Sequence, residues 1–82
     1  MTENRKTNTR LEAIELQELI LTIVKAIQPI SAEGIIAEVR KNYDEQPDEI
    51  RAAIFPLASI GEIVFHKQKR GMFILPDDEG KI

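Results

Sequence analysis

The sequence predicts a small α+β domain in which three helices and a short strand precede a C-terminal β-hairpin. Apolar residues recur at intervals of three and four over three segments, which is the spacing of an amphipathic helix. The third segment ends at Gly61, and two short apolar runs follow it, separated by a basic turn that contains Gly71. Two apolar runs joined by a short connection with a glycine are typical of a hairpin.

The first helix is expected to run from Thr9 to Ile27 or Gln28. Thr9 and Glu12 have the spacing of a capping box, and Pro29 stops the helix. Its core face, flanked by Val24, is expected to consist of Leu16, Leu19, Ile20, Ile23 and Ile27.

A second apolar stripe lies roughly opposite the core face of this helix. It consists of Leu11, Ile14 and Leu21, and it is more than a surface helix requires. Two interpretations stay open. Either the C-terminal strand or the N-terminal arm covers the stripe, or it forms a homodimer interface along the first helix.

Ile30 follows the first helix and is expected to add a strand of one or two residues to the hairpin. Ser31 then caps a second helix, predicted from Ala32 to about Asn42. Its core face is expected to consist of Ile35, Ile36, Val39 and Tyr43. Its solvent face is expected to consist of Glu33, Ala37, Arg40 and Lys41, of which the last two suit the helix dipole.

The third helix is predicted from Pro47, a favourable first residue, to Ile60, with Gly61 just beyond its end. Pro56 lies inside it and is expected to kink it or tighten its last turn. The buried stripe is expected to consist of Ile50, Ala53, Ile54, Leu57 and Ile60. The opposite face carries Asp48, Arg51, Ala52, Phe55 and Ser59.

The hairpin is predicted from a strand over residues 62–67 and a return strand over residues 72–75, which Pro76 ends. Gly71 is available for a positive φ in the turn. Side chains alternate along a strand, so Ile63 and Phe65 are expected on one face and Val64 and His66 on the other.

Outside a domain of residues 9–76, both ends of the chain are polar. Residues 1–8 are expected to form a flexible arm, weakly basic with Arg5, Lys6 and the adjoining Arg10, and residues 77–82 a loose acidic tail. The net charge is −3. Three of the 14 acidic residues are Asp77, Asp78 and Glu79. The other 11 balance the 11 basic residues of the chain, so local patches decide what it attracts.

Composition excludes several classes of protein. The chain has no cysteine, which excludes disulfides and thiolate metal sites. No apolar run approaches the ~20 residues of a membrane span, and the polar start predicts no signal peptide. We therefore expect a cytoplasmic protein without a membrane partner.

Three features together resemble the winged helix-turn-helix superfamily. They are the opening of the second helix at Ile30-Ser31, the closing of the third at Ile60-Gly61-Glu62-Ile63, and the turn Lys67-Gln68-Lys69-Arg70-Gly71. The resemblance covers roughly residues 9–76. It implies that the third helix enters the major groove of DNA and that the hairpin, or wing, contacts the adjacent phosphate backbone or minor groove.

Positive charge marks the candidate contacts to double-stranded DNA. The turn is the main one, because phosphates attract Lys and Arg, although lysines also keep the edge of a sheet from pairing with other chains. The candidate nucleic-acid contacts are Lys67, Lys69, Arg70, Arg51, Ser59, Arg40 and Lys41. Asp48 and Glu49 would repel phosphates at the start of the third helix.

Two functions follow. One is a non-enzymatic DNA-binding protein that regulates transcription, and that is a homodimer if the first helix pairs. The other is a protein-interaction module, which would use Phe55 on the third helix or the stripe of the first helix, because exposed apolar side chains mark protein contacts.

Catalysis has little support in the sequence. His66 is the only histidine and, beside lysines on a strand, is expected to face solvent. Ser31 and Ser59 are the only serines, and both have expected structural roles. No glycine-rich phosphate loop is present. We expect no enzyme, no metal and no cofactor.

Overall fold

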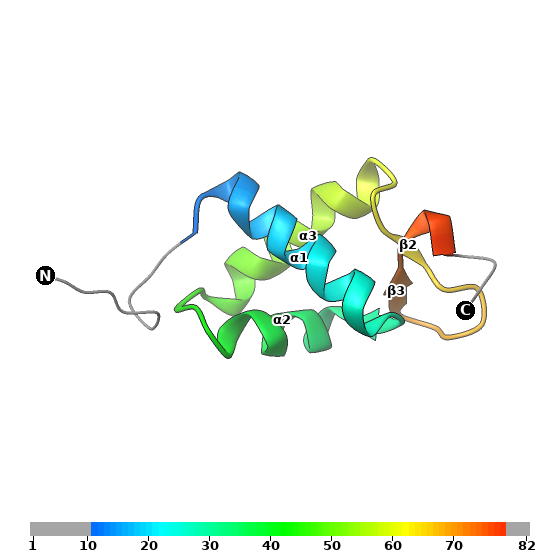
Figure 1. Ribbon diagram of the computed structural model, residues 1–82, viewed down its shortest axis with the longest axis horizontal. Helices are drawn as coiled ribbons and strands as arrows, with labels where there is room; N and C mark the ends of the chain where they lie inside the picture. The colour runs from blue at the N-terminus through cyan, green and yellow to red at the C-terminus, as the bar shows by residue number, and fades with distance from the viewer. Residues whose placement is uncertain (1–10, 79–82) are drawn as a thin grey trace, which may run out of the picture.

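The computed structural model describes residues 11–78 and confirms the α+β class and the predicted order of elements. Figure 1 shows the helices packed together, with the sheet and the hairpin at one end of the molecule and the start of α1 toward the other. The elements are α1 (Ala13–Ile27), β1 (Ile30–Ser31), α2 (Ala32–Arg40), α3 (Pro47–Ser59), β2 (Val64–Phe65), β3 (Met72–Ile74) and the 3-10 turn η2 (Pro76–Asp78).

The hydrophobic core lies between the three helices and the sheet. Each helix packs on the other two, and α1 also packs on β3. The core residues are Leu16, Ile20, Ile23, Val24, Ile30, Ile35, Ile36, Val39, Ile50, Ile54, Leu57, Ile63, Phe73 and Ile74. Most of them belong to the stripes that helical periodicity predicts, so burial of these stripes holds the helices together.

The sheet has the strand order β1-β3-β2, and both pairs are antiparallel. Ile30 pairs with Phe73, which confirms that this short segment adds a strand to the hairpin. Across the hairpin, the rings of Phe65 and Phe73 stack with centroids 4.6 Å apart. Strands β2 and β3 are shorter than predicted, since the residues at their ends turn away from the ladder.

The start of α1 corrects the prediction. The helix begins at Ala13, and its capping box consists of Glu12 and Glu15 instead of Thr9 and Glu12. Thr9 lies outside the described residues. Leu11 lies before the helix, and its backbone N–H donates to Oε2 of the buried Glu45 at 2.6 Å. This contact between distant parts of the chain holds the residue that precedes the capping box.

The ends of α2 and α3 follow local rules. Ser31 caps α2 as predicted, since its Oγ accepts from the Gly34 N–H at 3.0 Å. Helix α2 ends at Arg40, two residues before the predicted Asn42. Pro47 starts α3 and Gly61 follows its end with φ 84°, both as predicted.

The last turn of α3 places Ile60 on the surface, which corrects the prediction that it is buried. The N–H groups of Gly61 and Glu62 donate to the carbonyls of Ala58 and Leu57, at 3.2 and 2.9 Å. This is the hydrogen-bond pattern of a Schellman motif, in which the chain turns out of the helix. Ile60 is the C-cap, outside the regular helix, and it is 71% exposed.

The side chains of the hairpin also differ from the expected alternation. Ile63 is buried and Phe65 is exposed, although they were predicted to share a face, and His66 is buried instead of facing solvent. The β2 ladder covers only Val64 and Phe65, so strict alternation does not extend to the residues on either side.

The chain after β3 is anchored to the end of α1. The Leu75 N–H donates to Oε1 of Gln28 at 2.8 Å, and Nε2 of Gln28 donates to Oδ2 of Asp78 at 2.7 Å. Residues 76–78 form η2, so the start of the expected loose tail is ordered, and the rest of that tail lies outside the described residues.

Candidate nucleic-acid interface

The predicted DNA contacts with the most accessible charge lie in the turn between β2 and β3. Lys67, Lys69 and Arg70 are all exposed. Gly71 has φ 77°, which confirms the predicted positive φ. The turn is closed by the His66 N–H, which donates to the Met72 carbonyl at 2.7 Å, and by the Met72 N–H, which donates to the Lys69 carbonyl at 3.2 Å.

His66 shapes this turn from beneath. Its side chain is 8% exposed, and its Nδ1 accepts from the N–H groups of Gln68 and Lys69 at 3.0 and 3.1 Å. Nδ1 must therefore be unprotonated in this arrangement. Sequence reasoning missed this role. The sequence did carry a signal for it. His66 precedes Gln68 and Lys69 by two and three residues, and Asn and Asp side chains organise turns by accepting from backbone N–H groups at similar spacing.

Replacing His66 by Ala is expected to destabilise the domain by about 1–3 kcal/mol, because two backbone donors lose their acceptor. Urea unfolding measures the loss, and hydrogen exchange locates it at the Gln68 and Lys69 amides. His66→Asn is the matched variant, since its Oδ1 can accept from the same donors, and it should recover part of the protection. Equal protection of both amides in wild type and His66→Ala would show that the ring does not organise the turn.

Charges near the turn differ from those on the helices in how they are paired. Within residues 11–78, Lys67, Lys69 and Arg70 form no ion pair. On α3, by contrast, Arg51 pairs with Glu33 at 2.8 Å and with Asp48 at 3.4 Å, atoms Nη2 and Nη1 to carboxylate oxygens. These exposed pairs add little stability. They do mean that Arg51 must give up two carboxylates before it can bind a phosphate.

Arg40 and Lys41 do not join the turn in one surface. Helix α2 ends at the side of the molecule away from the hairpin (Figure 1), which places Arg40 and Lys41 far from it. Nζ of Lys41 also pairs with Oε2 of Glu38 at 2.9 Å. Ser59 is exposed at the end of α3. Arg5, Lys6 and Arg10 of the predicted arm lie outside the described residues.

The outer face of α3 carries two carboxylates in its first turn and an exposed aromatic ring further along. Asp48 and Glu49 are exposed in its first turn, where they stabilise the helix and repel phosphates. Phe55 is 75% exposed, as expected of a candidate protein contact. Arg51, the basic residue of this helix, forms ion pairs with Glu33 and Asp48.

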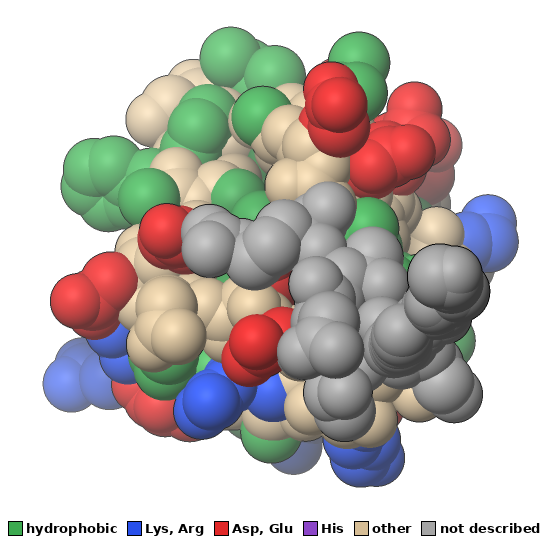
Figure 2. All heavy atoms as spheres, turned by 90° about the vertical axis from the view of Figure 1, so that its left-hand side faces the viewer, with side chains coloured by type: hydrophobic (Ala, Val, Ile, Leu, Met, Phe, Trp, Pro, Cys, Tyr) green, Lys and Arg blue, Asp and Glu red, His purple; other side chains and the backbone are tan. Residues whose placement is uncertain are grey.

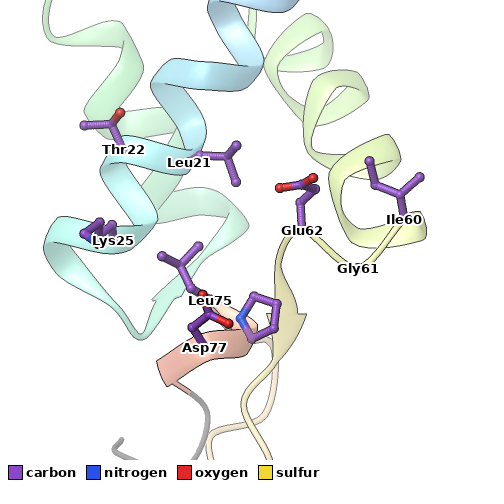
Figure 3. Close-up of a pocket in the computed structure, with 9 residues that line it drawn as sticks. Leu21, Thr22, Lys25, Ile60, Gly61, Glu62, Leu75 and Asp77 are labelled. Carbon is purple, nitrogen blue, oxygen red and sulfur yellow. The ribbon is translucent and has the colours of Figure 1, made fainter.

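The second stripe of α1 does not remain a single surface. Ile14 is 65% exposed, whereas Leu11 and Leu21 are partly buried against the core. Leu21 lines a cleft of about 420 Å³ together with Leu75 and Pro76, so the chain after β3 covers part of the stripe. Figure 3 shows Leu21 and Glu62 pointing toward one another across this cleft, while Ile60 points away from it.

Within residues 11–78, no group of three or more His, Asp or Glu side chains is placed to hold a metal ion. No helix of this part of the chain has the length and apolar character that crossing a bilayer demands. Comparison of the chain with protein-family models, with curated proteins and with solved structures found no match.

Proposed function

We propose that the protein is a non-enzymatic winged-helix DNA-binding protein whose hairpin turn binds the phosphates of duplex DNA. One observation carries the proposal: the three basic side chains of the turn, Lys67, Lys69 and Arg70, are exposed and free of ion pairs within residues 11–78. Phosphate contacts supply affinity that does not depend on sequence. The turn is also pre-shaped by His66, so little ordering is needed when it meets a phosphate.

The proposed binding is weakly selective for sequence. Recognition of bases in the major groove uses side chains such as Arg, Asn and Gln on the inserted helix. Helix α3 offers Arg51 and Ser59 for this purpose, and Arg51 is paired with two carboxylates. A regulator of transcription with this surface would gain specificity from a partner, from pairing of two copies, or from DNA shape. Its location would be the cytoplasm.

Fluorescence anisotropy of a labelled random duplex, titrated at two salt concentrations, tests the proposal. Binding should weaken steeply with salt. The double variant Lys69→Ala, Arg70→Ala should bind more weakly, and its slope of log K against log salt should be less steep by about 1.8, since each lost phosphate contact removes about 0.9. The variant Arg40→Ala, Lys41→Ala removes the same charge far from the hairpin and is the matched control.

Two results would reject the proposal. The first is absence of binding at low salt by the folded protein. The second is an equal decrease in slope for both double variants, which would mean that the duplex responds to net charge and not to the turn.

Protein binding is a second candidate, favoured by the exposure of Phe55 and Ile14. A homodimer along α1 would use Ile14, because Leu11 and Leu21 are partly buried. The variant Ile14→Glu tests this pairing in light scattering without disturbing the core: it should make a dimer monomeric. A wild-type protein that is monomeric at high concentration would dismiss the pairing.

A further inference from the structure

The hairpin exposes an aromatic ring that phosphate binding by the turn does not use. Phe65 of β2 is 60% exposed, although it lies opposite the buried Phe73 in the sheet. The two rings stack with centroids 4.6 Å apart and an angle of 28° between their planes. Phe73 therefore covers one face of the Phe65 ring, and the exposure of Phe65 belongs to its other face and its edge.

The open face of Phe65 belongs to the same hairpin as the positive charges of the turn. Lys67 follows Phe65 by two residues, so their Cα atoms are at most about 7 Å apart. Between them, His66 holds the turn through the N–H groups of Gln68 and Lys69. The ring and the charges are therefore parts of one pre-shaped surface, and the three basic side chains on it form no ion pair within residues 11–78.

A second exposed phenylalanine lacks such charges. Phe55 on α3 is 75% exposed. Its helix carries Asp48 and Glu49, and the single basic residue there, Arg51, is paired. Figure 2 views the end of the molecule opposite the hairpin, where Asp and Glu side chains lie beside hydrophobic ones. A partner that offers both negative charge and a flat ring is therefore expected at the hairpin and not on α3.

An unpaired nucleotide has the chemistry that fits this surface. Its base can stack on an aromatic ring, and its phosphate attracts Lys and Arg. Inside a duplex, each base is already stacked on its neighbours, so its face is closed to Phe65. A lipid surface fits less well, because insertion into it needs apolar side chains at the tip, and none of residues 67–71 has one.

We infer that the hairpin binds single-stranded DNA, with one base stacked on the open face of Phe65 and the neighbouring phosphates held by Lys67, Lys69 and Arg70. This inference rests on the proposed function, because the same three charges bind the phosphates in both. It adds a contact that phosphate attraction alone cannot supply, and it makes unpaired DNA a ligand of this site.

Two labelled strands of about eight nucleotides separate stacking from charge. One is made of thymidylate, and the other has the same number of phosphates but no bases. In fluorescence anisotropy, the wild-type protein should bind the thymidylate strand at least about five-fold more tightly. Both strands should show a similar slope of log K against log salt, about −2 for three phosphates of a single strand, since their phosphate contacts are the same.

The two exposed phenylalanines provide matched variants. Phe65→Leu keeps an apolar side chain over Phe73 but removes the stacking face, so its affinity for the thymidylate strand should fall to that for the strand without bases. Phe55→Leu makes the same change on α3 and should leave the affinity unchanged. Urea unfolding checks that both variants are folded.

A tryptophan at the same position reports stacking directly and keeps an aromatic ring in the hairpin. The chain has no Trp, so the emission of Phe65→Trp comes from this site alone. It should be quenched by the thymidylate strand and not by the strand without bases. The emission of Phe55→Trp should respond to neither.

The outcomes that overturn the inference differ from those that reject the proposed function. Equal affinity of the wild-type protein for the two strands would overturn the inference and leave phosphate binding by the turn in place. Absence of binding to either strand and to duplex at low salt would reject both. Equal losses in Phe65→Leu and Phe55→Leu would also overturn the inference. So would a change in Phe65→Trp emission with phosphatidylserine vesicles but not with thymidylate, since the partner would then be a lipid surface.

Discussion

Replacing Ile20 by Ala is expected to lower the free energy of unfolding by about 2–5 kcal/mol. Ile20 is 0% exposed and lies in the core where α1 faces the other helices. The variant loses the transfer free energy of the deleted methyl and methylene groups and leaves a cavity that the packed helices fill only in part. A domain of this size has a total stability of about 5–15 kcal/mol, so the loss is a large fraction of it. Urea unfolding followed by circular dichroism measures the change.

The same helix offers a control of identical chemistry. Ile14→Ala deletes the same atoms at a position that is 65% exposed, and it should change the unfolding free energy by less than about 0.5 kcal/mol. The difference between the two variants therefore isolates burial from helix propensity. If both substitutions cost the same, the packing of α1 described above is wrong.

Replacing Gln28 by Ala is expected to destabilise the domain by about 2–4 kcal/mol, because one neutral and one charge-assisted hydrogen bond are lost together. These bonds join the end of α1 to Leu75 and Asp78. Without them, η2 and the end of β3 should open locally before the helices unfold. Hydrogen exchange at the Leu75 amide, together with urea unfolding, measures the local and the global effect.

A double-mutant cycle with Asp78→Ala separates the two bonds of Gln28. Gln28→Ala and Asp78→Ala together should cost less than the sum of their separate costs, since both remove the bond to Oδ2. Gln17→Ala, on the same helix, is the control for loss of a glutamine side chain. Additive costs in the cycle would show that the Gln28–Asp78 bond contributes nothing to stability.

The parts of the fold that the sequence predicts correctly depend on contacts within a few residues. The cap of α2 is one, since Ser31 and Gly34 are three residues apart. The end of α3 is another, because Gly61 is free to adopt φ 84°. The helical stripes belong to the same class, since the 3.6-residue period of the chain itself decides which side chains share a face.

The candidate site was predicted in part. The exposure of Lys67, Lys69 and Arg70 could be predicted, because these residues lie in the turn between two short apolar runs. The pairing of Arg51 with Glu33 does not, because the two residues are 18 apart in the chain and meet only when α2 packs on α3. The support of the turn by His66 was missed because strand alternation places its side chain on the outer face. In the structure the ring is buried instead, where its Nδ1 accepts hydrogen bonds from two backbone amides and so stabilises the turn more than an exposed ring would.

The sequence by itself therefore determined the α+β class, the order of the elements, the helical stripes and the turn that carries positive charge. Only the tertiary structure decided how Leu11 is held before α1, which Lys and Arg side chains form no ion pair, and how the chain after β3 is anchored. The deciding hydrogen bonds join residues 34 and 50 apart, Leu11 to Glu45 and Gln28 to Asp78. Such partners are brought together by burial of the core as a whole, and no local period or motif encodes them.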